Sequence, residues 1–156
     1  MGNYAEGAAN AIRLAYRDDP PSGEDTEAIR ARVMQAIEQL ASGDEEAFWA
    51  IFDADVAFHE AQCLPYGGTH RGLAATRGAH DTIYDYFESI QIELEQILAA
   101  GDIVIAYAWM TYRVRKNGRS GRFPLAEVFR FKDGKVIEWR LHYFDAATVA
   151  ADIAAD

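Results

Sequence analysis

Two turn dipeptides in the second half of the chain constrain its fold more than any other feature. Asn117-Gly118 and Asp133-Gly134 each join two apolar runs, and their residues tolerate the positive φ angles that two-residue hairpin turns require. Gly101-Asp102 separates one further pair of runs. The expected strands are residues 90–99, 102–115, 121–132 and 135–145. Four strands joined by such short turns predict an antiparallel meander, because a parallel sheet needs a crossover, usually a helix, between consecutive strands.

The first half of the chain has helical periodicity instead. Ile29, Val33, Ile37 and Leu40 recur at the spacing of one helix face, which predicts a helix over residues 27–41. The other expected elements are a short helix from residue 44, a strand over 56–62 and a helix over 73–88.

Domain organisation follows from composition. Residues 1–25 are predicted to be an N-terminal extension, because residues 18–25 are polar, contain two prolines and have no periodic apolar face. Residues 26–156 are predicted to form a single domain, since a chain of 156 residues that is 50% hydrophobic has enough apolar material for one core.

The balance of charge limits the classes of partner. Fifteen Lys and Arg against 25 Asp and Glu give a formal charge of -10, which phosphate backbones and anionic membrane surfaces repel. No apolar run approaches the ~20 residues that span a bilayer. We therefore expect neither a nucleic acid nor a membrane as partner. Cys63 is the lone cysteine and no secretory signal precedes it, which together predict a cytoplasmic protein.

Two segments resemble motifs of a known family. Leu64-Pro65-Tyr66-Gly67-Gly68 resembles a stretch common in SnoaL-like proteins, and residues 129–138 followed by 143–145 resemble their terminal hairpin. Together with the order of elements, they make residues 26–150 similar to the SnoaL-like members of the nuclear transport factor 2-like superfamily. The resemblance implies a cone-shaped α+β fold, in which three helices wrap a curved antiparallel sheet around a pocket for an apolar small molecule.

The superfamily that the chain resembles is functionally mixed. It contains polyketide cyclases, ketosteroid isomerase, scytalone dehydratase and limonene epoxide hydrolase, and also members that only bind ligands or partner proteins. The resemblance therefore implies a pocket without deciding whether that pocket is catalytic.

Two arguments disagree about the faces of the last strand. Apolar alternation places Ile137, Trp139, Leu141 and Tyr143 in the core and His142 outside. In limonene epoxide hydrolase, which this strand resembles, a catalytic aspartate that faces the pocket occupies the position of His142. We follow the resemblance and expect His142 in the pocket. The apolar row then lies on the convex face and needs cover, which predicts a homodimer.

The Asp133-Gly134 turn extends this expectation to the neighbouring strand. Taken as a two-residue hairpin, it places Glu127 opposite Arg140 and Leu125 opposite His142, and cross-strand opposites share a face. The alternative for Glu127 and Arg140 is a solvated ion pair on an outer face. The residues predicted for this wall are the catalytic His142, Glu127 and Arg140 and the substrate-binding Leu125 and Phe144.

The turn at Asn117-Gly118 leaves two alternatives for the strand before it. A two-residue turn places the even-numbered residues of 106–110 beside Glu127, whereas the resemblance to limonene epoxide hydrolase places Tyr107 and Trp109 in the pocket. A bulge or a three-residue loop would reconcile the two. We follow the resemblance and expect Tyr107 and Trp109 to bind the substrate.

The remaining candidates lie earlier in the chain. Glu60 shares a strand face with Phe58, and ketosteroid isomerase carries its catalytic aspartate on the equivalent strand, so Glu60 is a candidate base and Phe58 a substrate contact. His59 replaces Glu60 if the strand is shifted by one residue, because a slip reverses every side chain. His80 lies on the inner stripe of its helix and Tyr66 in a loop. Both are candidate pocket residues, with ordinary core packing as the alternative.

A pocket with these residues suits acid/base chemistry without a cofactor. A carboxylate or imidazole removes a proton next to a carbonyl, and a hydroxyl or cation stabilises the enolate oxygen. The histidines are scattered and no Cys-rich pattern exists, so no metal site is expected. The chain is predicted to act as a lyase or isomerase of the polyketide cyclase type, on an apolar ketone. A binding protein without catalysis and a dimeric interaction module are the alternatives, and exposure of Glu138 and His142 would weaken the enzyme interpretation.

Overall fold

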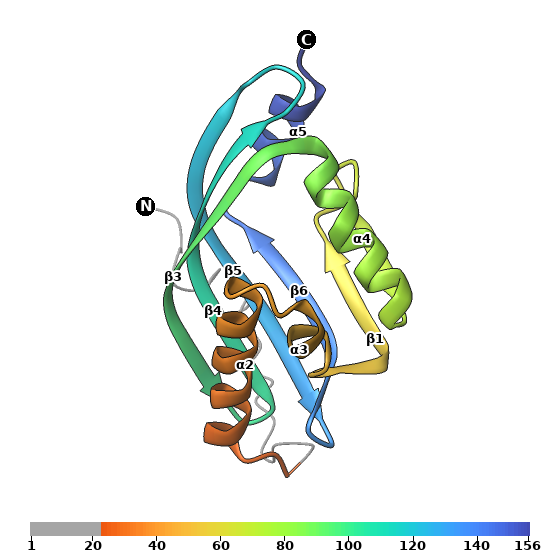
Figure 1. The fold of residues 1–156 in the computed structure, drawn as a ribbon, viewed down its shortest axis with the longest axis vertical. Coiled ribbons are helices and arrows are strands. Elements are labelled where there is room, and N and C mark those ends of the chain that lie inside the picture. Colours follow the sequence, from red (N-terminus) through yellow and green to blue (C-terminus); the bar gives the residue numbers. More distant parts are fainter. Residues whose placement is uncertain (1–22) are drawn as a thin grey trace, which may run out of the picture.

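The fold is a curved six-stranded sheet with helices over its concave face, as a computed structural model of residues 23–156 shows (Figure 1). The helices are α2 (Thr26–Ala41), α3 (Glu45–Trp49), α4 (Leu73–Tyr86) and α5 (Ala146–Ala154). The strands are β1 (Phe52–Glu60), β2 (Gly68–Arg71), β3 (Phe87–Ala100), β4 (Ile103–Val114), β5 (Ser120–Lys132) and β6 (Lys135–Tyr143). Most of the predicted extension, residues 1–22, lies outside the described residues.

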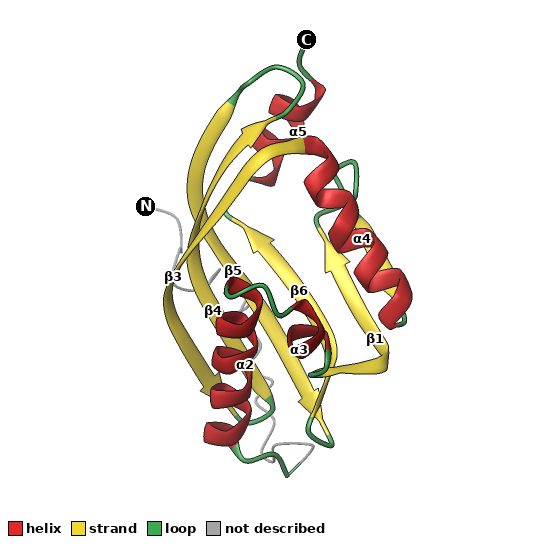
Figure 2. Ribbon diagram, in the orientation of Figure 1, coloured by secondary structure: helices red, strands yellow, loops and turns green. Residues whose placement is uncertain are grey.

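The sheet has the strand order β2-β1-β6-β5-β4-β3, so the second half of the chain forms an antiparallel meander as predicted. The hairpin between β5 and β6 turns on Asp133 and Gly134, with φ angles of 52° and 74°. β1 joins the meander through parallel pairing with β6, and β2 extends the sheet by antiparallel pairing with β1. The predicted α+β class and the curved sheet wrapped by helices are thus confirmed (Figure 2).

The core lies between the concave face and helices α2, α3 and α4 (Figure 1). Alternate residues of the central strands point into it, as a half-buried sheet requires. Its main members on β4, β5 and β6 are Val104, Ala106, Met110, Tyr112, Phe123, Leu125, Phe129, Phe131, Val136 and Trp139. Among residues 23–156, no helix is both long and apolar enough to cross a bilayer.

A β-bulge at Ile137 decides which residues of β6 face the core. Phe131 pairs with Val136, but the next residue of β5, Arg130, pairs with Glu138, so Ile137 is one extra residue on β6. Such an insertion breaks the regular alternation of side chains. Every residue of β6 beyond the bulge therefore points to the face opposite to the one that an uninterrupted hairpin would give it.

Candidate functional site

Two adjoining cavities lie between the helices and the concave face, with volumes of about 230 and 70 Å³. The residues that line both are His80, Tyr84, Ile92, Glu127 and Trp139. The larger cavity is completed by Ile37, Leu40, Ala41, Phe48, Leu94, Ala106 and Ala108. The smaller is completed by Ile83, Ile90, Met110, Leu125, Leu141 and Tyr143. Because the two share five side chains, we treat them as one site, the concave pocket.

Glu127 on β5 is the carboxyl group in the wall of this pocket. Its Oε2 accepts a hydrogen bond of 3.0 Å from the indole nitrogen of Trp139, which lies beside it on β6. Burial raises the pKa of Glu127 to about 7, and the hydrogen bond from Trp139 works in the opposite direction. Near neutral pH this group therefore exchanges readily between its acid and its base form.

A second carboxyl group, Glu60 at the end of β1, lies behind Tyr143 and is only 5% exposed. The Tyr143 hydroxyl donates to its Oε1 at 3.2 Å. Neither Glu60 Oε2 nor the buried Tyr66 hydroxyl has a hydrogen-bond partner within the described part of the chain. Glu60, Tyr66 and Tyr143 form what we call the Glu60 cluster, and Tyr143 connects it to the smaller cavity.

The electrostatics of the Glu60 cluster favour neutral groups. Burial raises the pKa of Glu60 to about 8, the hydrogen bond from Tyr143 opposes this, and the charge of Glu127 adds to it. Burial also raises the pKa of Tyr143 and of Tyr66, and the charge of Glu60 acts in the same direction. At pH 7 the cluster is therefore an uncharged source of hydrogen-bond donors next to the pocket.

His80 on α4 lies in the wall of the concave pocket, where its predicted role as a substrate contact would place it. Its ring meets Trp49 edge-on at 5.2 Å and lies 5.9 Å from Trp139. Burial lowers its pKa despite the nearby carboxylate of Asp81, so the imidazole is neutral near pH 7.

The prediction that His142 and Arg140 face the pocket is wrong. Both side chains are exposed on the convex face, where Arg140 donates to Glu138. The Ile137 bulge shifts the register by one residue, so that Leu141 lies opposite Glu127 and Tyr143 opposite Leu125. Apolar alternation alone predicted these faces correctly, whereas the resemblance to limonene epoxide hydrolase gave the wrong face for His142.

The prediction that Tyr107 and Trp109 line the pocket is also wrong. The loop between β4 and β5 is longer than two residues, with Arg113 paired to Ser120, but it preserves the faces that a two-residue turn would give. The even-numbered residues of 106–110 therefore face the pocket side. Trp109 lies on the convex face, with its indole donating to Glu95 at 3.0 Å and Arg122 stacked on its ring at 4.4 Å.

Of the remaining predicted residues, two belong to the pocket or the Glu60 cluster and two line neither cavity. Leu125 lines the smaller cavity, and Tyr66 belongs to the Glu60 cluster. Phe58 is fully buried, with its ring 4.5 Å from that of Trp139, so it supports the pocket from behind. Phe144 is 79% exposed beyond the end of β6 and lies outside the pocket.

The structure resolves the choice between His59 and Glu60 in favour of Glu60. His59 points to the convex face, where Nδ1 lies 2.9 Å from the Thr69 hydroxyl and Nε2 lies 3.0 Å from Glu138. The prediction missed Tyr84, which lies one helical turn after His80 on the same face of α4 and also lines the pocket. Its spacing of four residues from His80 indicates this position from the sequence.

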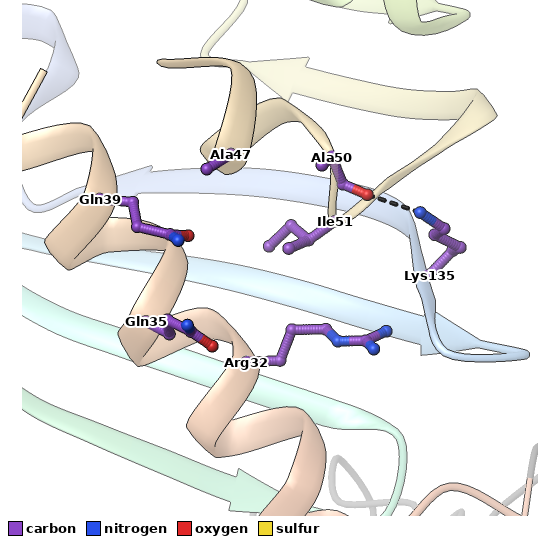
Figure 3. A pocket seen from close by; sticks show the side chains of 7 residues that line it. All are labelled: Arg32, Gln35, Gln39, Ala47, Ala50, Ile51 and Lys135. Carbon is purple, nitrogen blue, oxygen red and sulfur yellow. Dashed lines mark hydrogen bonds between the residues drawn. The ribbon is translucent and has the colours of Figure 1, made fainter. Parts of the chain in front are cut away.

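A larger groove, of about 350 Å³, lies away from these groups between α2, α3 and the start of β6 (Figure 3). Its two cationic side chains are both engaged with backbone carbonyls. Lys135 donates to the oxygen of Ala50 at 2.5 Å, and Arg32 donates to the oxygen of Gly134. The groove holds no buried acid or base, so we do not regard it as the reactive site. Across residues 23–156, no group of three or more His, Cys, Asp or Glu side chains is arranged to hold a metal ion.

The fold of the chain is nuclear transport factor 2-like, because it is similar to solved structures of that fold. An NTF2-like protein from Burkholderia thailandensis is 21% identical, with a TM-score of 0.74 over 85% of this chain and 100% of that one. A putative SnoaL-like polyketide cyclase from a Jannaschia species is 18% identical, with a TM-score of 0.66 over 86% of this chain and 100% of that one.

A third structure, from Catenulispora acidiphila, has a ketosteroid isomerase-like fold and was solved in complex with trimethylamine. It is 18% identical, with a TM-score of 0.59 over 71% of this chain and 84% of that one. The sequence profile of the SnoaL-like domain matches residues 33–139, well over half of the chain. The chain therefore belongs to the SnoaL-like domain family. No curated protein matches it in sequence.

Proposed function

We propose that the concave pocket carries out acid/base chemistry without a cofactor on an apolar carbonyl compound, as in an isomerisation, cyclisation or dehydration. The observation that carries the proposal is a pair of carboxyl groups with pKa values near 7 and 8, Glu127 in the wall of the pocket and Glu60 behind the pocket residue Tyr143. A catalytic acid or base works best when its pKa lies near the working pH.

The two carboxyl groups have different parts in this mechanism. Ionised Glu127 takes a proton from the carbon next to the carbonyl, and the C–H electron pair forms the C=C bond of an enolate. The Tyr143 hydroxyl donates to the enolate oxygen. In the free protein the Tyr143 hydroxyl donates to Glu60 across 3.2 Å. The mechanism requires this bond to reverse, with protonated Glu60 donating to the Tyr143 oxygen, so that the Tyr143 hydrogen turns to the substrate. Return of the proton from Glu127 to another carbon completes an isomerisation.

The size of the pocket narrows the substrate. Only together do the cavities of about 230 and 70 Å³ reach the lower end of the range of about 300–1,000 Å³ for sites that hold drug-sized ligands. We therefore propose a compound with one or two rings. His142 and Glu138 lie on the convex face, so no imidazole of β6 takes part and the proposal depends on Glu127 and Glu60.

Exchange of the α-protons of small cyclic ketones for deuterium, followed by NMR, tests the proposal without knowledge of the natural product. We expect exchange above the buffer rate, and a loss of at least about 100-fold in Glu127→Gln, because general base catalysis contributes about that much. Glu138→Gln, a carboxyl change on the convex face, is the matched control and should keep its exchange rate. Equal rates in the parent and in Glu127→Gln would contradict the mechanism.

A binding protein without turnover is the second candidate. In its favour, the similar Catenulispora structure was solved with a small molecule, trimethylamine, bound. Binding of cyclic ketones, detected by quenching of tryptophan fluorescence, with no deuterium exchange would support this candidate over catalysis.

The predicted basis for a dimer is wrong, because Trp139, Leu141 and Tyr143 of the last strand line the concave pocket and not the convex face. We nevertheless infer a cytoplasmic homodimer, on another surface. The convex face of β4 and β5 carries a half-buried apolar surface formed by Ile105, Tyr107, Trp109, Pro124 and Val128. A surface of this kind gains free energy when a second copy covers it. Sedimentation analysis should give the mass of a dimer, and Val128→Lys should give that of a monomer. The cytoplasmic location rests on the lone cysteine, and cell fractionation tests it.

A further inference from the structure

The charges that shift the pKa values of Tyr84 and His80, two residues of the pocket wall, are all negative. After burial, the groups that raise the pKa of Tyr84 are Glu127, Glu45 and Asp81. Asp81 and Glu45 likewise act on His80. Among residues 23–156, neither cavity is lined by a lysine or an arginine. The pocket therefore presents a negative potential, within a chain whose formal charge is -10.

The nearest basic side chain on α4 does not offset this potential. Arg77, one turn before His80, forms an ion pair with Glu46 and lies over the ring of Trp49, 5.4 Å from its centroid. The positive charge of Arg77 is thus neutralised by Glu46, which does not line the cavity. Within residues 23–156, the side chain that donates a hydrogen bond to Glu127 is the neutral indole of Trp139.

Aromatic rings form the wall around Glu127. Phe48, His80, Tyr84 and Trp139 all line the larger cavity. The ring of Trp139 lies 5.8 Å from Phe48, and that of His80 lies 5.3 Å from Tyr84. The faces of such rings attract cations, and the attraction strengthens when water is excluded.

A carboxylate in such a wall lacks a counter-ion, and a bound cation would supply it. An anion would meet Glu127 as a like charge and a neutral apolar ligand would favour its protonated form, whereas a cation favours the carboxylate. We propose that the concave pocket binds apolar amines as ammonium ions, with Glu127 as the counter-ion and the rings of Trp139, Tyr84 and Phe48 around the cationic head. This rests on the proposed function in using the same pocket, and it adds that the substrate carries a basic nitrogen.

The test compares ligands that differ in charge but little in size. The probes are benzyltrimethylammonium, its uncharged carbon isostere neopentylbenzene and the anion phenylacetate, with binding followed by tryptophan fluorescence, to which Trp139 in the pocket wall contributes. We expect the cation to bind at least about 10-fold more tightly than the isostere, corresponding to about 1.4 kcal/mol, and phenylacetate to bind more weakly than either. Equal affinities for cation and isostere, or preference for the anion, overturn the proposal.

Two variants locate the effect. Glu127→Gln keeps an acceptor for the Trp139 indole but removes the charge, so it should abolish the preference for the cation and leave neopentylbenzene binding unchanged. Tyr84→Leu, at a half-exposed position, should reduce the preference by a few fold if Glu127→Gln does not fold. Glu138→Gln should change neither affinity. A preference that persists in both Glu127→Gln and Tyr84→Leu would refute the assigned site. The deuterium-exchange experiment uses ketones and no amines. A negative result there would contradict the proposed reaction but not amine binding, and a negative result with the charged probes would contradict amine binding but not the reaction.

Discussion

Glutamate side chains on the two faces of the sheet have pKa values shifted in opposite directions. Glu127 on the concave face has no cationic partner in the described structure, and burial raises its pKa to about 7. Glu138 on the convex face contacts His59, Arg130 and Arg140. Partial burial works against its ionisation, but the hydrogen bonds from Arg140 and Arg130 outweigh burial and lower its pKa.

The two pKa values differ because Glu127 is buried without a cation, whereas Glu138 accepts hydrogen bonds from two arginines. On the convex face, the lowered pKa of Glu138 keeps it an anion, in a network of contacts that runs from His59 through Glu138 and Arg130 to Asp102. Carboxyl groups on the concave face stay close to the midpoint of their titration. A side chain that changes its protonation state during a reaction belongs on the second kind of surface.

The largest expected difference between the faces concerns tryptophan. Trp139 is 3% exposed and stacks on Phe129 at 5.7 Å, whereas Trp109 is half-buried on the convex face. We expect Trp139→Ala to lower the free energy of unfolding by about 4 kcal/mol, and Trp109→Ala by about 1 kcal/mol. Urea denaturation of both variants measures this. Equal losses would show that the convex face packs as tightly as the core.

The next effect is a dependence of stability on pH. Glu60 holds its proton up to about pH 8 in the folded protein but releases it near 4.5 when unfolded, so the folded state binds more protons between these values. Stability therefore falls as the pH rises through this window. Gln at position 60 does not ionise, so Glu60→Gln should gain on the order of 3 kcal/mol over the parent between about pH 5 and pH 9.

Glu138→Gln provides the opposite sign for this comparison. The lowered pKa of Glu138 means that its contribution is present above its ordinary pKa of 4.5 and is lost as the pH falls through its folded value. The difference between Glu138→Gln and the parent should thus be constant from pH 5 to pH 9. Thermal melts across this range measure both variants, and a flat profile for Glu60→Gln relative to the parent would mean that Glu60 titrates normally.

The smallest effect comes from moving a cation to the concave side. Leu94 is 41% exposed and lines the larger cavity, while Leu98 is 52% exposed and pairs with Ile105 on the convex face of the same edge strand. Leu94→Lys should lower the pKa of Glu127 by about one unit, because an opposite charge nearby favours the carboxylate. Leu98→Lys should leave it unchanged. NMR titration of labelled glutamate measures both, and identical shifts would indicate a general charge effect.

The sequence predicted the meander because turn chemistry is local. Asp133 and Gly134 adopt the positive φ angles that their side chains allow, and the strands that they join follow. The bulge at Ile137 has no such marker, and it alone moved His142 out of the predicted pocket. The alternation around Trp139 carried the correct faces, since burying an indole outweighs an isolated polar position.

The composition of the site was predictable only in part. Glu60 and His80 followed from the periodicity of their own strand and helix. The contact between Glu60 and Tyr143 joins residues 83 positions apart, on strands that pair in parallel, and no local pattern specifies such a pairing. The pKa values near neutrality arise from burial and contacts that form only in the folded protein. The candidate groups were therefore predictable from the sequence, but their pKa values were not.

The parallel pairing of β1 with β6 also has a consequence for the order of folding. Hairpins of the meander close loops of a few residues, whereas β1 meets β6 only after some eighty intervening residues have been ordered, as the separation of 83 between Glu60 and Tyr143 indicates. Closure of a long loop costs more entropy, so contacts of this kind form late. We expect the meander to fold first as a scaffold, and the chemical groups of the pocket to meet only when its first strand docks beside its last.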